Sequence, residues 1–359
     1  NLMTIKPFLS ERISRYKKFF ADESPGQILG VISPYTLQLD YPKLKSDKTL
    51  REWDLENNIE KMIAQNVLRL RYFLQETKEL ENDFIPSLHP GLGIGLNSAY
   101  YSGAEIKFGD TTSWVEPVIK DWSDLQKLAF NKENKWYKYL VRMSKKLTAM
   151  NDGDYFIQTF AHFSPLDMAQ ALRGEQLFFD FYDHPQWVKK LLESCTRAIV
   201  SLEKELREVI NQPATGLGIW GMWLPGQPVF MSEDIADICQ QEVYREFAFP
   251  FSQKVIDTFD GGFIHHHAKG LHQHQEIVKL SGIKAIEISL DPNTERPIDH
   301  MEQLLAANEG IPLMTRCYPR DVYDNIEVLK KGRVILMLQV DSINEGQEVM
   351  EFIRSHSKV

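Results

Sequence analysis

Five of the ten histidines in this chain lie in one short segment, GGFIHHHAKGLHQH, which covers residues 261–274. An apolar run leads into three consecutive histidines, His265, His266 and His267, so the segment is typical of a buried strand that ends in imidazoles. Side chains alternate across a strand, which places His265 and His267 on one face and His266 on the other. Two imidazoles on one face can bind a single metal ion. The alternative is a pair of hydrogen-bonded polar residues at the start of a loop.

The next two predicted strands add further candidate metal ligands. Glu287 lies inside the apolar run KAIEISL, where a carboxylate is costly unless it is paired, protonated or bound to a metal. Cys317 ends the run IPLMTRC and would be a soft ligand as a thiolate, although a lone cysteine is commonly a small core residue. We therefore predict a metal site formed by His265, His267, Glu287 and Cys317.

Three polar residues near the ends of other predicted strands are candidate catalytic groups. His162 follows the run YFIQTF, Arg316 lies at the end of IPLMTRC, and Asp341 follows RVILMLQV. In a barrel of parallel strands the active site lies at the carboxyl ends of the strands, so we expect all three to act on the substrate. Capping of the following turn is the alternative for His162.

Candidate substrate-binding residues come from two further segments. Trp220 and Trp223 lie in GIWGMWLPGQPVF, at and after the fourth predicted strand, where they would form the walls of a pocket or pack inside the barrel. His272 lies in the stretch that leads from the histidine cluster into a helix, and we expect it above the site.

The elements that must position these residues alternate along the chain. Eight short apolar runs are predicted strands: QILGVIS, DFIPSL, YFIQTF, GLGIWGMW, GGFIHHH, KAIEISL, IPLMTRC and RVILMLQV. Amphipathic helical segments lie between them, including one predicted to begin at Ser232 as an N-cap, with Glu233 and Asp234 in its first turn. The pattern predicts a single (β/α)8 TIM barrel over residues 1–359, in which the irregular region 35–151 forms a long excursion over the barrel mouth. An open doubly wound sheet is the alternative.

Composition narrows the class of protein. The chain carries 41 Lys and Arg against 50 Asp and Glu, a net charge of −9, and has no basic run, which argues against nucleic-acid and membrane-surface binding. Three widely spaced cysteines argue against a disulfide framework and for a reducing compartment. No apolar run approaches the roughly 20 residues that span a bilayer, and the first residues lack the apolar core of a signal peptide. We therefore expect a cytoplasmic protein.

Several stretches resemble one enzyme superfamily. SEDIADICQQEVYREFAFPFSQKVIDTF followed by GGFIHHHAKG is similar to a helix-then-strand block of the uroporphyrinogen decarboxylase superfamily, and SPLDMAQALRGEQLFFDFYDHPQWVKKLLE and SERISRYKKFFADESPGQILGV fit the same block order. The resemblance spans nearly the whole chain and implies a (β/α)8 barrel. It also implies one of two chemistries. The first is cofactor-free decarboxylation of tetrapyrrole acetate arms, and the second is zinc-dependent methyl transfer between a thiol and a corrinoid carried by a partner protein.

The chain differs from both branches of that superfamily. The R-Q-A-G-R motif of the decarboxylases is absent, and only Arg316 stands clearly at a strand end to bind a carboxylate arm. The methyltransferase branch resembles the chain at His265, with its next ligand, normally cysteine, replaced by His267, and with Glu287 matching its acidic ligand. The late cysteine of that branch is replaced by Asp341.

We therefore predict a zinc-dependent methyltransferase that acts with a corrinoid partner protein on a thiol or another small methyl acceptor or donor. Two alternatives stay open. One is a decarboxylase-like carboxy-lyase in which Arg316, His162 and Asp341 bind and protonate the ligand, and the other is a barrel redirected to bind a small molecule. A homodimer is the expected assembly, because two-fold dimers are the commonest homo-oligomers.

Overall fold

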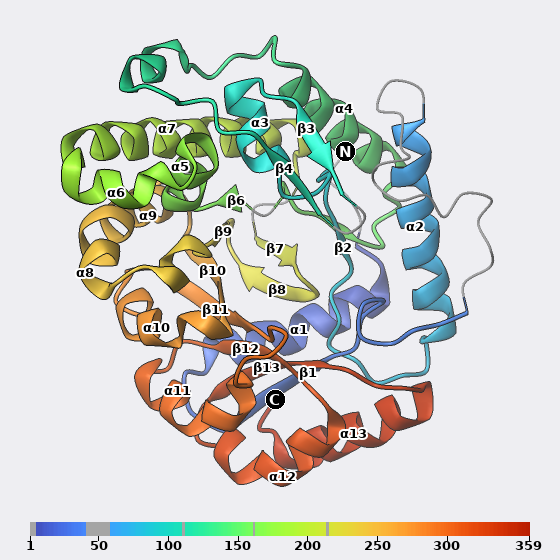
Figure 1. Ribbon diagram of the computed structural model, residues 1–359. Helices are drawn as coiled ribbons and strands as arrows, with labels where there is room; N and C mark the ends of the chain where they lie inside the picture. Colours follow the sequence, from blue (N-terminus) through green and yellow to red (C-terminus); the bar gives the residue numbers. More distant parts are fainter. Residues whose placement is uncertain (1–4, 41–57, 110–111, 161, 213–214) are drawn as a thin grey trace.

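The computed structural model describes residues 5–40, 58–109, 112–160, 162–212 and 215–359 (Figure 1). Its centre is a seven-stranded sheet in which every neighbouring pair is parallel. In spatial order the strands are β1 (Gln27–Val31), β13 (Arg333–Leu338), β12 (Leu313–Cys317), β11 (Ile283–Ser289), β10 (Gly262–His267), β9 (Val229–Ser232) and β6 (His162–Phe163). The predicted α/β class is therefore confirmed.

Two further strands continue the arrangement beyond this sheet. β2 (Ser87–Leu88) pairs in parallel with β5 (Phe156–Ile157), which precedes β6 in the same segment. On the other side, the backbone N–H of Asp83, just before β2, donates to the carbonyl of Gly30 in β1 at 3.0 Å. The order of these segments is consistent with a TIM-barrel-like fold, although the seven-stranded sheet and the β2–β5 pair are separate hydrogen-bonded units.

The run GLGIWGMW, predicted as the fourth strand of the barrel, does not join the main sheet. The run GLGIWGMW forms an antiparallel hairpin of β7 (Gly216–Ile219) and β8 (Met222–Pro225), and β9 takes the place beside β10 in the main sheet. The two residues at the turn, Trp220 and Gly221, have φ angles of 48° and 81°. Positive φ at both central residues is the geometry of a tight hairpin turn, so the W-G pair reverses the chain where a continuous strand was expected.

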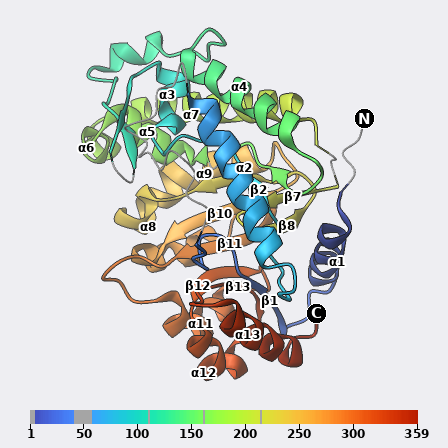
Figure 2. The same cartoon turned by 90° about the vertical axis from the view of Figure 1, so that its right-hand side faces the viewer.

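Helices surround the sheet (Figures 1 and 2). The longer ones are α1 (Pro7–Ala21), α2 (Ile59–Glu76), α4 (Lys135–Met150), α7 (Pro185–Ile210), α12 (Pro319–Leu329) and α13 (Ile343–His356). The shorter ones are α3 (Leu96–Ser102), α5 (Pro165–Arg173), α6 (Gln176–Asp183), α8 (Gln241–Val243), α9 (Phe249–Ile256), α10 (Leu271–Ile277) and α11 (Met301–Ala307). Each of the longer helices buries an apolar stripe, which in α7 includes Leu191, Cys195 and Leu202.

The region expected as an excursion over the barrel mouth forms several separate elements. Its described part contains α2, α3, α4 and the antiparallel pair β3 (Ile106–Phe108) and β4 (Ser113–Val115), and residues 41–57 and 110–111 lie outside the described residues. Figures 1 and 2 place α2 on the outside of the molecule, where it packs against α4. Among the described helices, none is both long and apolar enough to cross a bilayer.

The helix predicted to begin at Ser232 is broken into pieces. Ser232 ends β9, a single 3-10 turn follows at Ile235–Ile238, and α8 begins only at Gln241. A π-helical turn, Tyr244–Ala248, then joins α8 to α9, in which Pro250 cannot donate a backbone hydrogen bond. As a result Asp234 lies in a loop at the carboxyl end of β9.

Candidate metal centre

The register of the sheet defines two rows of side chains on one face of the strands. Partners in register share a face, because side chains alternate along each strand. We call the first row the lower rung; it consists of His265, Glu287, Met314 and Ile335. The upper rung lies two residues further along each strand and consists of His267, Ser289, Arg316 and Met337.

This face of the sheet opens to solvent at the upper rung. All four side chains of the upper rung are half-buried, whereas Met314 and Ile335 of the lower rung are fully buried. The residues between the rungs point to the opposite face and are completely buried: His266, Ile288, Thr315 and Leu336. The two rungs therefore lie on one face of the sheet at the carboxyl ends of the strands, the end at which barrel enzymes carry their active sites. We use the word hollow for the space that this face borders.

Three candidate metal ligands converge at the edge of this hollow. One ligand atom from each of Asp234, His265 and His267 lies within 4.8 Å of the other two. Oδ1 of Asp234 is 3.3 Å from Nε2 of His267 and 3.7 Å from Nε2 of His265. This oxygen is buried and makes no hydrogen bond. Two ring nitrogens and the carboxylate oxygen that forms ion-pair contacts with both thus face one another, an arrangement that fits a bound cation.

The other ring nitrogen of each histidine is held by a second carboxylate. Nδ1 of His265 is hydrogen-bonded to Glu287 of β11, and Nδ1 of His267 lies 2.7 Å from Oδ1 of Asp291. Histidines that ligate a metal usually donate their other N–H to a carboxylate in this way, which fixes the tautomer and the ring orientation. Glu287 and Asp291 therefore leave Nε2 of each imidazole to face Asp234.

The loop that carries Asp234 is fixed by buried acidic side chains. The carboxylate of Asp167 in α5 accepts hydrogen bonds from the Ser232 hydroxyl at 2.6 Å and from the backbone N–H groups of Asp234 at 3.1 Å and Ile235 at 2.8 Å. Asp237 accepts the backbone N–H of His267 at 2.9 Å. These bonds tie the loop after β9 to both α5 and β10, so Asp234 is positioned before any ligand binds.

The surrounding carboxylates favour protonated imidazoles. Asp234 and Asp291 raise the pKa of His267 to about 10, against the opposing effect of partial burial. Burial lowers the pKa of His265, but the Glu287 carboxylate outweighs it, and the net pKa is raised. Because protons and metal ions compete for the same ring nitrogens, a bound cation must displace the protons that face Asp234.

The third histidine of the cluster belongs to a separate buried network. His266 points to the opposite face, where its Nε2 lies 3.1 Å from Nδ1 of His274, and Nε2 of His274 is hydrogen-bonded to Asn308. Burial lowers the pKa of both imidazoles. Nε2 of His272 in α10 lies 3.0 Å from the carbonyl oxygen of Cys239, so this imidazole is hydrogen-bonded to the main chain of a neighbouring loop.

Two of the four predicted ligands are placed differently from the prediction. Glu287 lies beside the group as the hydrogen-bond partner of His265. Cys317 is fully buried on the face of β12 opposite to Arg316 and the rungs, and burial raises the pKa of its thiol. The structure does not bring Cys317 to the histidines, because it lies three positions after Met314, whose side chain shares their face, and an odd offset along a strand reverses the face.

We expect Cys317→Ala to bind zinc to the same extent as the wild-type protein. The thiol faces the helix side of the sheet, so its loss leaves the three converging ligands untouched. Metal analysis of the purified variant, beside Cys239→Ala as a matched buried cysteine, measures this. A Cys317→Ala protein that is folded by circular dichroism but binds less zinc than the wild type and Cys239→Ala would contradict the placement.

His162 forms a structural pair between the sheet and a helix. It is in register with Met231 of β9, which is in turn in register with Ile264, so its side chain lies on the helix-facing side of the sheet. Its Nε2 is 2.5 Å from Oε2 of Glu203 in α7, and both side chains are only 1% exposed. Arg207 binds the other oxygen of Glu203 at 2.6 Å. The predicted catalytic position of His162 is therefore corrected, because the imidazole points away from the hollow.

Glu203→Gln should destabilise the protein by about 3 kcal/mol at pH 7, because the half-buried Arg207 loses its counter-charge and the buried His162 loses its carboxylate partner. Burial alone raises the pKa of Glu203, but Arg207 and His162 outweigh it and lower the value to about 2. The pair therefore stabilises the fold above the ordinary carboxyl pKa, and this contribution is lost as the pH falls toward about 2. Urea unfolding at pH 7 and pH 3, with the exposed Glu208→Gln as control, measures the effect; equal stability of the two variants at pH 7 would exclude it.

The remaining predicted residues differ in their distance from the hollow. The ring of Trp220 lies 5.0 Å from that of His265 and packs on Phe230, so it forms a wall beside the candidate metal ligands. Trp223 is buried in β8 against Gly216, as core packing requires. Asp341 is exposed beyond β13, where its backbone N–H donates to Glu345, and Arg316 belongs to the upper rung.

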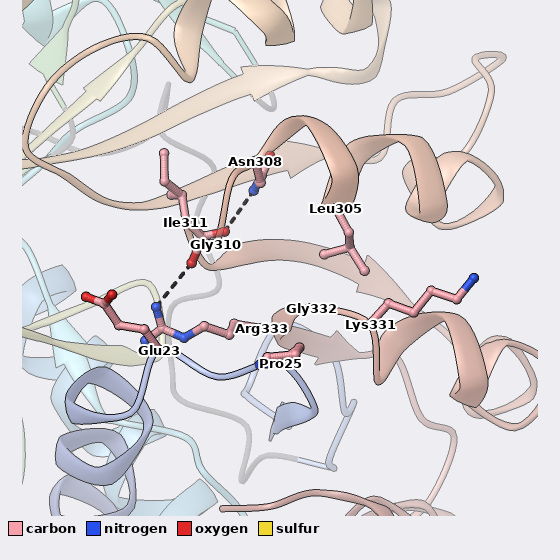
Figure 3. Close-up of a pocket in the computed structure, with 9 residues that line it drawn as sticks. All are labelled: Glu23, Pro25, Leu305, Asn308, Gly310, Ile311, Lys331, Gly332 and Arg333. Atoms are coloured by element: carbon pink, nitrogen blue, oxygen red, sulfur yellow. Dashed lines mark hydrogen bonds between the residues drawn. The ribbon is translucent and has the colours of Figure 1, made fainter.

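A separate pocket lies at the other end of the strands. Figure 3 shows this cavity of about 220 Å³, lined in part by Gly310 and Ile311 before β12 and by Arg333 at the start of β13. Nη1 of Arg333 donates to the Gly310 carbonyl at 3.1 Å, and the amide of Asn308 donates to Ile311 at 3.0 Å. Because it opens at the amino ends of the strands, this pocket is not part of the candidate site.

Comparisons with known proteins support the architecture. No protein-family model matches the chain, and no curated protein matches it. Among solved structures, a methyltransferase from Methanosarcina mazei has a similar fold, with a TM-score of 0.61 and 14% identical residues over 97% of this chain and 98% of that chain. At 14% identity, this similarity shows a shared fold and not a shared activity.

Proposed function

We propose that this protein is a zinc-dependent methyltransferase that exchanges a methyl group between a corrinoid partner protein and a small thiol or another heteroatom substrate. The observation that carries the proposal is the convergence of Asp234, His265 and His267, with carboxylates behind both imidazoles. The fold shared with a protein described as a methyltransferase supports it, as does the resemblance of the sequence to the superfamily with zinc-dependent members.

The chain supplies three protein ligands. Nε2 of His265, Nε2 of His267 and Oδ1 of Asp234 would hold the ion, and a site with three protein ligands keeps one tetrahedral position for a substrate. Zinc in such a site acts as a Lewis acid that favours the ionised form of a thiol at neutral pH. Glu287 and Asp291 keep the imidazoles in the ligating tautomer and add negative charge behind them.

The hollow determines how a substrate reaches these ligands. The helix-facing side of the strands is completely buried, so substrate and methyl donor must enter from the upper rung. Trp220 covers one side of His265 and shields it from water, which strengthens electrostatic interactions at the ligand group. The methyl-carrying partner would therefore dock at the carboxyl ends of the strands.

A direct test combines metal loading with methyl transfer. Zinc-loaded protein, mixed with methylcobalamin as a stand-in for the corrinoid partner and with a panel of small thiols, should convert the cobalamin spectrum and yield methylated thiol. The metal-free protein and the His265→Ala variant should be inactive. Decarboxylation of a porphyrinogen by metal-free protein, or tight binding of iron in place of zinc, would contradict the proposal.

A further inference from the structure

Arg316 is a cation without a protein partner on the open face of the sheet. It is half-buried in the upper rung, and among the described residues it has no hydrogen bond, ion pair or ring contact. Arg296, which lies nearby in the sequence, shows the contrast, because its guanidinium is bound by both Asp299 and Asp321. A partly desolvated guanidinium without a counter-ion is unfavourable unless a ligand supplies one.

The register places Arg316 on the same face of the sheet as the candidate metal ligands His265 and His267, two strands away from them. Ser289 is in register with His267, and Ser289 and Arg316 each directly follow the last paired residues of β11 and β12, Ile288 and Thr315. His267 and Arg316 thus share one rung and are two strands apart, which separates their backbones by roughly 10 Å. Side-chain alternation puts both residues on the same face of the sheet, so a small molecule bound over this face can touch both at once.

The surroundings of the two imidazoles and those of Arg316 favour different chemical groups. Asp234, Glu287 and Asp291 surround the imidazoles with negative charge, which suits a cation and repels free carboxylates. Arg316 presents a planar set of N–H donors that matches a carboxylate in a bidentate geometry. We propose that the substrate is a small organic acid whose carboxylate binds Arg316 while its thiol or other heteroatom reaches the group of Asp234, His265 and His267. The binding of the thiol or other heteroatom rests on the proposed function, whereas the binding of the carboxylate to Arg316 does not.

The test uses ligands that differ in the carboxylate alone. In protein loaded with Co²⁺, the absorption bands report thiol binding, and 3-mercaptopropionate should bind at least tenfold more tightly than 1-propanethiol. Arg316→Gln should weaken binding of 3-mercaptopropionate by about 10- to 100-fold and leave 1-propanethiol unchanged, because a charge-assisted hydrogen-bond pair is lost. Arg320→Gln removes an exposed arginine of α12 that pairs with Asp324 and serves as the matched control. Equal affinities in the wild type, or a preference that survives in Arg316→Gln, would overturn the inference.

A second arm separates this inference from the metal proposal. Binding of ¹³C-labelled propionate to metal-free protein, followed by NMR, needs no ion at the histidines. Weakening of propionate binding in Arg316→Gln but not in Arg320→Gln supports the carboxylate site even if the protein binds no cobalt. Propionate binding that is the same in all three proteins overturns it even if the metal site is intact.

Discussion

Asp234→Asn will lower the zinc affinity of the protein by about 100-fold. The substitution keeps the size of the side chain but removes the negative charge from the oxygen that lies 3.3 Å from Nε2 of His267 and 3.7 Å from Nε2 of His265. A neutral amide is a poor zinc ligand compared with a carboxylate, so the ion keeps two good ligands in place of three. Competition with a chromophoric chelator at pH 7.5 measures the affinity.

The control for this prediction is Asp324→Asn, which changes an exposed carboxylate that pairs with Arg320 in α12. It should bind zinc as the wild type does. If Asp234→Asn retained wild-type affinity while His265→Ala lost it, the third ligand would have to be another group, and Glu287 would be the first residue to consider.

Zinc affinity should rise steeply with pH between about 6 and 8. In the metal-free protein the pKa of His267 is raised to about 10 by Asp234 and Asp291, and that of His265 is raised by Glu287 in spite of burial. For each proton that zinc displaces, the zinc affinity increases about tenfold per pH unit. Displacement of the protons on both His267 and His265 therefore gives an increase of up to about 100-fold per pH unit. Titrations of zinc at pH 6, 7 and 8 measure the slope.

The same shifts have an opposite effect on the stability of the metal-free protein. The raised pKa of His267 means that the folded state binds its proton more tightly than the unfolded chain does. This stabilisation is complete below the ordinary histidine pKa of about 6.5 and is lost as the pH rises through about 10. Asp291→Asn should flatten both the stability profile and the zinc titration, and a zinc affinity independent of pH in the wild type would show that the imidazoles are not the ligands.

Much of the central site could be predicted from the sequence because it depends on local alternation. The apolar lead-in predicts a strand, and the strand period alone places His265 and His267 on one face and His266 on the other, as the structure has them. The predicted α/β class follows from the spacing of buried strands and amphipathic helices. Both features can be predicted from residues that are close together in the sequence.

The errors arise where one strand must be aligned with another. Whether Cys317 faces the histidines depends on the register between β10, β11 and β12, in which a shift of one residue moves a side chain to the other face. His162 was assigned to the site because it follows a strand, but its register with Met231 turns it toward Glu203 of α7. The partner that explains a buried histidine is 41 residues away in sequence.

Asp234 was missed because its segment was interpreted as the first turn of a helix. The sequence does carry a signal for it: the apolar run VFMS directly precedes Glu233 and Asp234, which is the order expected of a strand with acidic residues at its carboxyl end. To assign this strand, the turn at Trp220 and Gly221 has to be recognised first. It shows that the run GLGIWGMW is a hairpin and that β9 is the parallel strand next to β10.

Metal content is the most direct test of the central claim. Elemental analysis of wild-type protein, purified and reconstituted with zinc, should find about one zinc per chain, and the His265→Ala/His267→Ala double variant should contain less than about a tenth of that while remaining folded. The absence of metal from wild-type protein after reconstitution, or an equal zinc content in the double variant, would contradict the claim. The histidines would then serve as acid–base or hydrogen-bonding groups in a protein that works without a metal.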